Sequence, residues 1–559
     1  MRNGGLNTLI RKEPVMTNAE YDVPQPSNEP VRSYAPGTIE RELLKSKLAE
    51  LKGEELEIPL IIGGREIRTG TFGRAVIPHD HRRILARYHI AGADEIELAV
   101  GAAKEAWEEW SRFPWEDRAS VFLRAAQLLA NEYRYTLNAA TMLNQSKTVF
   151  QAEIDSAAEL VDFFRFNVCY MTQIYRNQPN SSPGTWNRME YRPLEGFVFA
   201  VTPFNFTSIA GNLPTAPALM GNTVIWKPAS AAVFSGYYIM RLLMLAGLPD
   251  GVINFLPGPG REFGPRVLEN PNLAGVHFTG STDVFRSMWR VVGEHIEGYR
   301  CYPRIVGETG GKDFFFVHPS FKDVDRIAAG VVRGAFEYQG QKCSAASRGY
   351  IPKSLWPQLK ARLGELVEEI GVGDVEDFTN FMGAVIDGDT FRKHREYIEL
   401  AKSSPDYKII FGGRYDDSVG YFVWPTIVET GDPKSRLMEE EIFGPIFTVW
   451  VYEDSEYDRT LSLCNETSPY GLTGCIWSQD REAVRKALDI LRHAAGNFYI
   501  NDKPTGAVVG QQPFGGGRAS GTNDKAGSIL NLLRWTSPRS IKENFNPPGD
   551  FRCPHMEEK

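Results

Sequence analysis

The feature that most constrains the fold is an alternation of strand and helix patterns that begins at Gly196. Short apolar runs alternate with segments of helical character, and each run ends in turn-forming residues. Strands that alternate with helices of about 10–15 residues indicate βαβ units, and such units build a parallel sheet covered by helices. We expect strands at 196–201, 222–226, 252–256 and 273–278, and helices at 210–219, 231–246 and 282–292.

Polar residues and glycines follow the ends of these strands, at Asn205, Lys227, Gly258 and Ser281. A parallel sheet binds ligands at the carboxyl ends of its strands, so these four positions are expected to share one crevice. Ser281 directly precedes a helix, where it can cap the helix and leave free amides for a phosphate. No Gly-x-Gly-x-x-Gly fingerprint follows these strands, so the four strand ends together carry the dinucleotide prediction.

One cysteine stands in a sequence that suits a nucleophile, Gly340-Gln341-Lys342-Cys343-Ser344. The thiolate is the reactive form, and Lys342 or a helix N-terminus would favour it. Because free cysteines are commonly buried for packing, the stretch is ambiguous alone. Upstream, Glu308 is followed by Gly310 and Gly311, so its carboxylate can lie in a tight turn that faces a cleft and serve as a general base.

Composition excludes several classes of protein. The 559 residues suggest two to four domains, and the chain has 24% charged residues and no apolar run near the roughly 18 residues of a membrane span, so we expect no membrane insertion. Net charge is −8 and no basic stripe is present, which argues against a nucleic-acid partner. The six scattered cysteines show no CxxC and no zinc spacing, so we expect a reducing compartment, no disulfide framework and no metal site.

The N-terminal part offers weaker signals. Met1–Lys12 has no apolar core, which excludes a secretory signal and leaves a short mitochondrial presequence open. The proline-rich residues 23–37 are expected to form an extended arm, most simply a mobile tail. Helices are expected from Arg118, with Phe122, Ala125, Ala126 and Leu129 on one face, and from 152 to 164. Within the second helix, Glu153 is expected on a solvated face rather than in a cleft.

Seven motifs occur in the order found in aldehyde dehydrogenases, which the chain resembles over residues 55–545. They are Phe204-Asn205-Phe206, Trp226-Lys227-Pro228, Phe278-Thr279-Gly280-Ser281, Glu308-Thr309-Gly310-Gly311-Lys312, Gly340-Gln341-Lys342-Cys343, Glu441-Ile442-Phe443-Gly444-Pro445 and Pro513-Phe514-Gly515-Gly516. Finer features resemble the 1-pyrroline-5-carboxylate (glutamate semialdehyde) dehydrogenase branch; they are Gln151-Ala152-Glu153-Ile154-Asp155, Phe336-Glu337-Tyr338-Gln339 before the cysteine motif, Phe498-Tyr499-Ile500-Asn501-Asp502-Lys503 and Gly521-Thr522-Asn523-Asp524.

The resemblance implies oxidation of L-glutamate 5-semialdehyde to L-glutamate with NAD, the second step of proline catabolism. Cys343 would attack the aldehyde, Asn205 and the Cys343 amide would hold the oxyanion, and Glu308 would activate water to hydrolyse the thioester. The alternatives are an enzyme for another acidic semialdehyde and a catalytically silent structural member. A fragment of a bifunctional proline-oxidising enzyme would need a further flavin-binding barrel, for which we expect no room here.

For the cofactor, Lys227 is expected near the adenosine ribose, and Glu441 and Phe443 at the nicotinamide ribose. An acid often stands three residues after that lysine in the family and repels a 2′-phosphate; this chain has Ser230 there, which leaves NADP open beside NAD. The full set of expected cofactor contacts is Thr202, Pro203, Phe204, Lys227, Ser230, Gly258, Gly280, Ser281, Glu441 and Phe443.

The substrate carries an α-carboxylate and an α-ammonium, so its pocket needs anion donors. Ser344 offers a hydroxyl, and Gly506-Ala507 offers backbone amides in a small-residue loop. Phe206 and Phe514 are expected to hold the aliphatic stem. The simpler interpretation of the Gly506-Ala507 loop is a connecting turn, and that of Phe514 is a core aromatic residue.

The resemblance also implies an α/β aldehyde dehydrogenase fold with a Rossmann-like parallel-sheet NAD-binding domain, an α/β catalytic domain and a β-flap for oligomerisation. A homo-oligomer built from dimers is expected, with a proline dehydrogenase as a candidate partner and a cytoplasmic location, or alternatively the mitochondrial matrix. The expected divisions are an N-terminal arm (1–40), the NAD-binding domain (41–180 and 197–316), the catalytic domain (317–505), the flap (181–196 and 528–545) and a substrate-anchor and Pro-Phe-Gly-Gly loop region (506–527).

Overall fold

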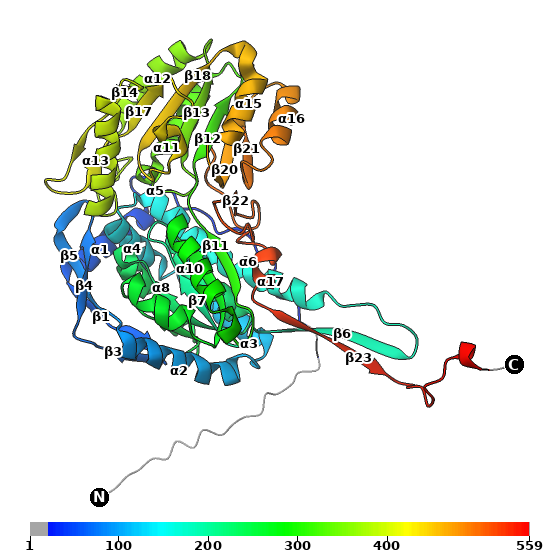
Figure 1. The fold of residues 1–559 in the computed structure, drawn as a ribbon. Coiled ribbons are helices and arrows are strands. Elements are labelled where there is room, and N and C mark those ends of the chain that lie inside the picture. Colours follow the sequence, from blue (N-terminus) through cyan, green and yellow to red (C-terminus); the bar gives the residue numbers. More distant parts are fainter. Residues whose placement is uncertain (1–18, 20, 558–559) are drawn as a thin grey trace, which may run out of the picture.

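The computed structural model describes residue 19 and residues 21–557. Two seven-stranded sheets form two lobes, with strand orders β11-β10-β7-β8-β9-β2-β3 and β14-β17-β18-β13-β12-β20-β21 (Figure 1). The chain passes from the first sheet to the second between β11 (Arg304–Glu308) and β12 (Asp313–Val317). Glu308 therefore ends the first sheet, whereas Cys343 lies in the second lobe, just before β13 (Ala346–Pro352).

The first sheet confirms the predicted βαβ alternation. Strands β7 to β11 pair in parallel, and all seven residues of β10 are buried, as expected of a sheet covered on both faces. The strands of this sheet are β2 (Leu60–Ile62), β3 (Arg65–Ile67), β7 (Phe197–Val201), β8 (Thr223–Lys227), β9 (Ile253–Phe255), β10 (Leu273–Thr279) and β11. The helices that connect its parallel strands include α7 (Thr207–Leu219), α8 (Val233–Leu245) and α10 (Thr282–Glu294), each within a few residues of its prediction.

The second sheet is parallel except for β14, which pairs antiparallel with β17 at the edge. Its strands are β12, β13, β14 (Tyr407–Phe411), β17 (Thr426–Thr430), β18 (Ile446–Tyr452), β20 (Thr473–Trp477) and β21 (Asn497–Ile500). Its helices are α11 (Val324–Phe336), α12 (Trp356–Glu369), α13 (Gly388–Ser403), α14 (Arg436–Glu439), α15 (Tyr457–Glu466) and α16 (Arg481–Ile490). The buried phenylalanines 314–316 of β12 alternate between the two faces, and each face packs a separate core.

A helical layer covers the first sheet. In α3 (Trp115–Ala130) the predicted face of Phe122, Ala125, Ala126 and Leu129 is buried, which confirms the amphipathic pattern. The layer also contains α1 (Ile39–Gly53), α4 (Arg134–Gln145), α5 (Val149–Ala152), a π-helical segment (Glu153–Glu159) and α6 (Leu160–Arg176). A small sheet of β1 (Leu56–Ile58), β4 (Phe72–Ile77) and β5 (Asp80–His89) lies beside this layer. On the other face of the sheet, α2 (Ala93–Trp110) and α10 pack a separate core.

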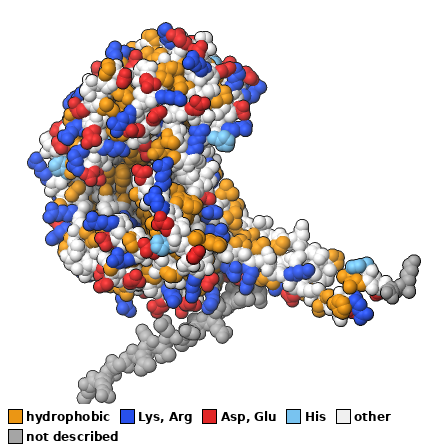
Figure 2. Space-filling model, viewed as in Figure 1, with side chains coloured by type: hydrophobic (Ala, Val, Ile, Leu, Met, Phe, Trp, Pro, Cys, Tyr) orange, Lys and Arg blue, Asp and Glu red, His pale blue; other side chains and the backbone are white. Residues whose placement is uncertain are grey.

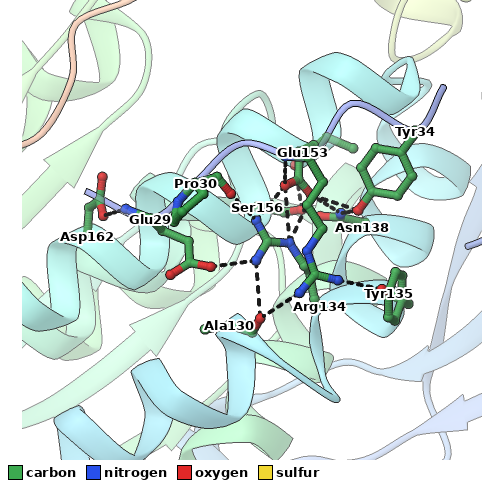
Figure 3. A network of polar contacts seen from close by, with 12 residues as sticks. Glu29, Pro30, Tyr34, Ala130, Arg134, Tyr135, Asn138, Glu153, Ser156 and Asp162 are labelled. Atoms are coloured by element: carbon green, nitrogen blue, oxygen red, sulfur yellow. Dashed lines mark hydrogen bonds and ion pairs between the residues drawn. The ribbon is translucent and has the colours of Figure 1, made fainter. Parts of the chain in front are cut away.

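Two predictions about the N-terminal part are wrong. The proline-rich arm is extended, but residues 28–34 are docked on α4 and α6 rather than mobile, with Tyr34 buried. Glu153 faces neither solvent nor a cleft: it is fully buried and accepts hydrogen bonds from Arg134 and Tyr34 (Figure 3). The general tendency of acids to be exposed fails here because two distant segments supply a cation and a hydroxyl to the same carboxylate.

A two-stranded ribbon projects from the body of the molecule (Figures 1 and 2). It pairs β6 (Thr185–Arg192) with β23 (Ser537–Asn544) in antiparallel register. The C-terminal part of the predicted flap (528–545) is strand only from Ser537, because 529–533 form a short helix, α17 (Ile529–Leu533), capped by Ser528. Among the helices of the described residues, none has the length and apolar character needed to span a membrane.

Candidate active site

Cys343 lies where two cavities meet, and it lines both of them. One cavity, of about 730 Å³, lies at the carboxyl ends of the first sheet. The other, of about 250 Å³, lies between the π-helical segment, α7 and the loop of residues 503–508. The recess between the lobes is lined by apolar side chains on the face shown in Figure 2. A group bound in either cavity can therefore reach the same sulfur atom.

The backbone that leads to Cys343 is strained. Tyr338 and Gln339 have φ values of 52° and 55°, and Gly340 follows at 65°. Consecutive left-handed residues other than glycine are costly and persist only where the surroundings fix them. The amide of Gln339 fixes this loop: its Nε2 donates to the carbonyl oxygens of Ser146 (3.0 Å) and Ala384 (2.7 Å), and its Oε1 accepts from Gly383 N (3.1 Å).

The surroundings of Cys343 keep its thiol protonated. Burial raises its pKa well above the ordinary value, and the negative charges of Glu308, Asp313 and Glu441 act in the same direction. The expectation that Lys342 favours the thiolate is wrong, because its ammonium is buried in an ion pair with Glu337 at 3.0 Å. To act as the predicted nucleophile, Cys343 must therefore first lose its thiol proton.

Glu308 stands at the end of β11 and lines the smaller cavity together with Cys343. Burial raises its pKa to about 8; the nearby Lys525 ammonium opposes this shift, while Asp524 adds to it. A carboxyl group with a pKa near neutrality is suited to take a proton from water. The general-base role of Glu308 stays a prediction, and its position beside Cys343 is compatible with it.

Asn205, the predicted oxyanion donor, is buried at the start of α7 and lines the larger cavity with Cys343. Its side-chain Nδ2 donates one hydrogen to Gln341 O at 3.0 Å, which orients the amide. An amide nitrogen carries two hydrogens, so the second is available for an oxyanion on the substrate carbon.

Glu441 reaches the same region from the second lobe. Its Oε1 accepts from Gly311 N at 2.9 Å, and burial raises its pKa to about 7. A Cβ on Gly310 would overlap the Glu441 carboxylate, so a glycine is required there. The glycines at 310 and 311 thus allow the Glu441 carboxylate to approach the backbone that follows Glu308.

The larger cavity suits a dinucleotide. Buried Lys227 donates to Pro228 O at 3.2 Å, and an ammonium has two further N–H donors. Burial lowers the pKa of Lys227 to about 8, so an anionic or hydroxyl partner would be favourable. Ser281 Oγ accepts from Val284 N at the start of α10, which places that helix N-terminus on the cavity wall, where a phosphate can bind.

Most of the predicted cofactor contacts line this cavity. They are Thr202, Pro203, Phe204, Lys227, Gly280, Ser281, Glu441 and Phe443. Gly258 and Ser230 are outside the wall: Gly258 packs against Phe263, and Ser230 is exposed in a short helical turn. A direct contact between these two residues and a cofactor stays a prediction.

The smaller cavity brings together all the predicted substrate contacts, which are Phe206, Ser344, Gly506, Ala507 and Phe514. The Ser344 hydroxyl lies 2.8 Å from Thr505 Oγ1, which connects the nucleophile loop to the Gly506-Ala507 loop. Behind the ring of Phe206, the buried Lys147 ammonium lies 4.2 Å from the ring centroid. A cation–π contact with Lys147 therefore fixes the orientation of the Phe206 ring.

Comparison with known proteins shows the family. The aldehyde dehydrogenase family model matches residues 69–541. The mitochondrial delta-1-pyrroline-5-carboxylate dehydrogenase of Dictyostelium discoideum is 54% identical over 96% of this chain and 97% of its own length. This chain belongs to the aldehyde dehydrogenase family. The crystal structure of delta-pyrroline-5-carboxylate dehydrogenase from Mycobacterium tuberculosis bound with NAD is similar with a TM-score of 0.94 and 52% identity, covering 97% of this chain and all of that one.

Two acids on the wall of the smaller cavity of this aldehyde dehydrogenase, Asp155 and Glu159, are not among the predicted site residues. Asp155 accepts from Thr207 N and Ser208 N, and pairs with Lys147 at 2.6 Å; Glu159 accepts from Ser208 Oγ at 2.7 Å. Burial raises the pKa of Glu159 to about 8. Their spacing of four residues was the available signal, because residues so spaced share one helical face.

Replacing Gln339 with alanine should disable the nucleophile without touching either cavity. The change leaves the carbonyl groups of Ser146 and Ala384 without their donor, and the strained loop can relax. A misplacement of about 1 Å can cost about 100-fold in rate, so we expect a comparable loss of kcat. Alkylation of Cys343 by iodoacetamide, followed by mass spectrometry, should slow as well. Gln127→Ala, on the exposed face of α3, is the matched control. Full activity of Gln339→Ala would show that the hydrogen bonds of the Gln339 side chain are not needed to place Cys343.

Glu308→Gln should stabilise this aldehyde dehydrogenase, and the gain should grow with pH. The carboxyl group loses its proton near its ordinary pKa of 4.5 in the unfolded chain but near 8 in the folded one. Between these values only the folded state keeps the proton, so the Glu308 carboxyl group lowers the stability of the wild type as pH rises, and the variant lacks this contribution. Thermal unfolding at pH 5 and pH 8 measures the difference, with exposed Glu294→Gln as control. A pH-independent gain would contradict the elevated pKa.

Proposed function

We propose that this aldehyde dehydrogenase oxidises L-glutamate 5-semialdehyde, the open form of 1-pyrroline-5-carboxylate, to L-glutamate with NAD, in the second step of proline catabolism. The observation that carries this proposal is the lining of the smaller cavity, where the Gly506-Ala507 loop, the Ser344 hydroxyl, the buried Asp155 and the partly exposed Glu159 lie around apolar side chains that lead to Cys343. The names of the relatives described above support the same substrate.

The substrate groups match this wall in charge. The α-carboxylate would accept from Ser344 and from the amides of Gly506 and Ala507. The α-ammonium would face Glu159 and Asp155, and its charge would favour the ionised form of Glu159. Phe206 and Phe514 would enclose the aliphatic stem between the two ends.

The reaction proceeds on Cys343. The Cys343 thiol gives its proton to solvent water, and the sulfur bonds to the aldehyde carbon as the carbonyl π bond breaks. The resulting oxyanion is held by Asn205 Nδ2 and the Cys343 amide. NAD, when bound by the residues of the larger cavity, supplies the acceptor for the hydride that leaves this carbon. When the hydride leaves this carbon, the oxyanion re-forms the carbonyl group and a thioester to Cys343 remains. Glu308 then takes a proton from water; the hydroxide attacks the thioester, the carbon–sulfur bond breaks, and glutamate leaves.

A steady-state screen tests this proposal. Pyrroline-5-carboxylate, succinate semialdehyde and propanal are compared with NAD and with NADP. The highest kcat/KM is expected for pyrroline-5-carboxylate with NAD. Preference for succinate semialdehyde would assign the enzyme to another acidic aldehyde, and preference for propanal would reject an anion-binding pocket.

Ser344→Ala should selectively impair the carboxylate-bearing substrate. A lost hydrogen bond to a charged group costs about 1.5–3 kcal/mol, so kcat/KM for pyrroline-5-carboxylate should fall roughly 10- to 150-fold. Turnover of propanal, which lacks the carboxylate, should change little. Equal losses for both substrates would mean that Ser344 supports only the geometry of the nucleophile loop.

We also propose that the enzyme is a homo-oligomer built from dimers. The β6–β23 ribbon is largely exposed, and isolated two-stranded ribbons are only marginally stable, so a second copy is expected to cover it. Light scattering after size-exclusion chromatography should give at least twice the mass of one chain, and deletion of residues 537–559 should reduce it. A wild-type monomer would refute this assembly.

The compartment is also a proposal. The Dictyostelium relative has "mitochondrial" in its name, which favours the matrix alternative over the cytoplasm. Residues 1–18, where a presequence would lie, are outside the described residues. Fractionation of cells that produce the full chain distinguishes the two locations.

A further inference from the structure

We propose that the N-terminal arm (residues 28–34) completes the outer wall of the substrate cavity with Val31 and positions the anchor loop, defined as residues 506–511, through Asn28. This inference rests on the proposed function and deepens it: the arm sets the affinity for aldehydes that carry a carboxylate. Asn28 is a positioning residue, because it affects substrate binding only through its contacts with the anchor loop.

Val31 places the arm at the cavity. It lines the smaller cavity next to Phe150 and Ile154, and all three side chains are partly exposed. The outer rim is therefore built from three segments that are far apart in sequence: the arm, α5 and the π-helical segment. Without the arm, this side of the cavity would open to solvent.

Asn28 connects the arm to the anchor loop. Its Nδ2 donates to Val509 O at 2.8 Å, and its Oδ1 accepts from Gln511 Nε2 at 2.9 Å. The same Nδ2 donates its other hydrogen to Asp162 on α6, at 2.7 Å. One side chain thus ties the loop that follows Gly506-Ala507 to a rigid helix, which reduces the conformational freedom that substrate binding would otherwise have to remove.

The arm is itself firmly attached through buried charges (Figure 3). Arg134, whose side chain is fully buried, pairs with Glu29 at 2.7 Å and donates to Pro30 O at 2.8 Å. Glu153, on the opposite side of Arg134, accepts from Arg32 N and from Tyr34 Oη, each at 2.8 Å. Because an unpaired buried charge is costly, removing the arm would leave this network incomplete, which favours the docked position.

The π-helical segment connects this network to the cavity. Glu153 faces the arm, whereas Asp155 and Glu159 line the substrate cavity. Single π-helical turns are frequent at functional sites because they change which side chains share a face. The arm therefore contacts both substrate-binding regions, the anchor loop directly and the acid pair through one continuous helix.

Asn28→Ala tests the inference in the full-length enzyme. Loss of its two hydrogen bonds to the loop should raise KM for pyrroline-5-carboxylate about 5- to 30-fold, while kcat, the KM for NAD and propanal turnover stay near wild type. Amide hydrogen exchange in residues 506–511 should become faster. Asp22→Asn, which removes an exposed ion pair with Arg176 farther out on the same arm, is the matched control and should change none of these values.

Gln511→Ala removes one of the two hydrogen bonds between Asn28 and the anchor loop from the loop side, so a smaller rise in KM for pyrroline-5-carboxylate is expected, and it keeps the test valid if Asn28→Ala does not fold. An equal loss of kcat/KM for pyrroline-5-carboxylate and propanal would contradict the inference, because it would show that the arm supports only the packing of the protein. Unchanged KM in both variants would overturn the inference. If the wild type prefers another acidic aldehyde, the proposed substrate fails, and the same variant-to-wild-type ratio measured with that aldehyde still tests the arm.

Discussion

The rest of the active site depends on the Gln339 clamp, which is the set of hydrogen bonds from the Gln339 side-chain amide to Ser146, Ala384 and Gly383. It holds two consecutive left-handed residues in a conformation that an unsupported chain would leave. Its partners come from the end of α4 and from the 383–384 loop, so the clamp exists only when the two lobes are docked. Placement of Cys343 between its two cavities is therefore a property of the assembled lobes.

Burial sets the chemistry of this site more than charge pairing does. Desolvation raises the pKa values of Cys343, Glu308 and Glu441 and lowers that of Lys227. These shifts all favour the neutral forms of the four groups. They also make the site costly for folding, since each of these groups would be more readily ionised in water.

The substrate side shows how a distant segment supplements a catalytic fold. Asp155 and Glu159 reach the cavity because a π-helical turn changes the register of one helix, while Glu153 in the same turn serves the arm. Arg134 then unites the arm and the helix in one buried network. Recognition of the substrate and docking of the N-terminal arm are thus parts of the same structure.

The sequence by itself determined the βαβ alternation and the strand ends at Lys227 and Ser281, because these depend on local periodicity. Ordered motifs also singled out Cys343, Glu308 and Asn205 as candidate site residues, and their roles stay predictions. The structure confirmed the strands and helices within a few residues, and it brought the five predicted substrate contacts to one wall. Contact roles for Ser230 and Gly258 stay predictions.

Only the tertiary structure decided where Glu153, Lys342 and the arm would lie. Glu153 is buried because Arg134 and Tyr34 approach it, and Lys342 is neutralised by Glu337 instead of activating the thiol. Local patterns cannot reveal such partners, since the energy of a buried charge depends on groups that arrive from elsewhere in the chain. The same physical reason explains the elevated pKa of Glu308, which follows from desolvation that exists only after the lobes have packed.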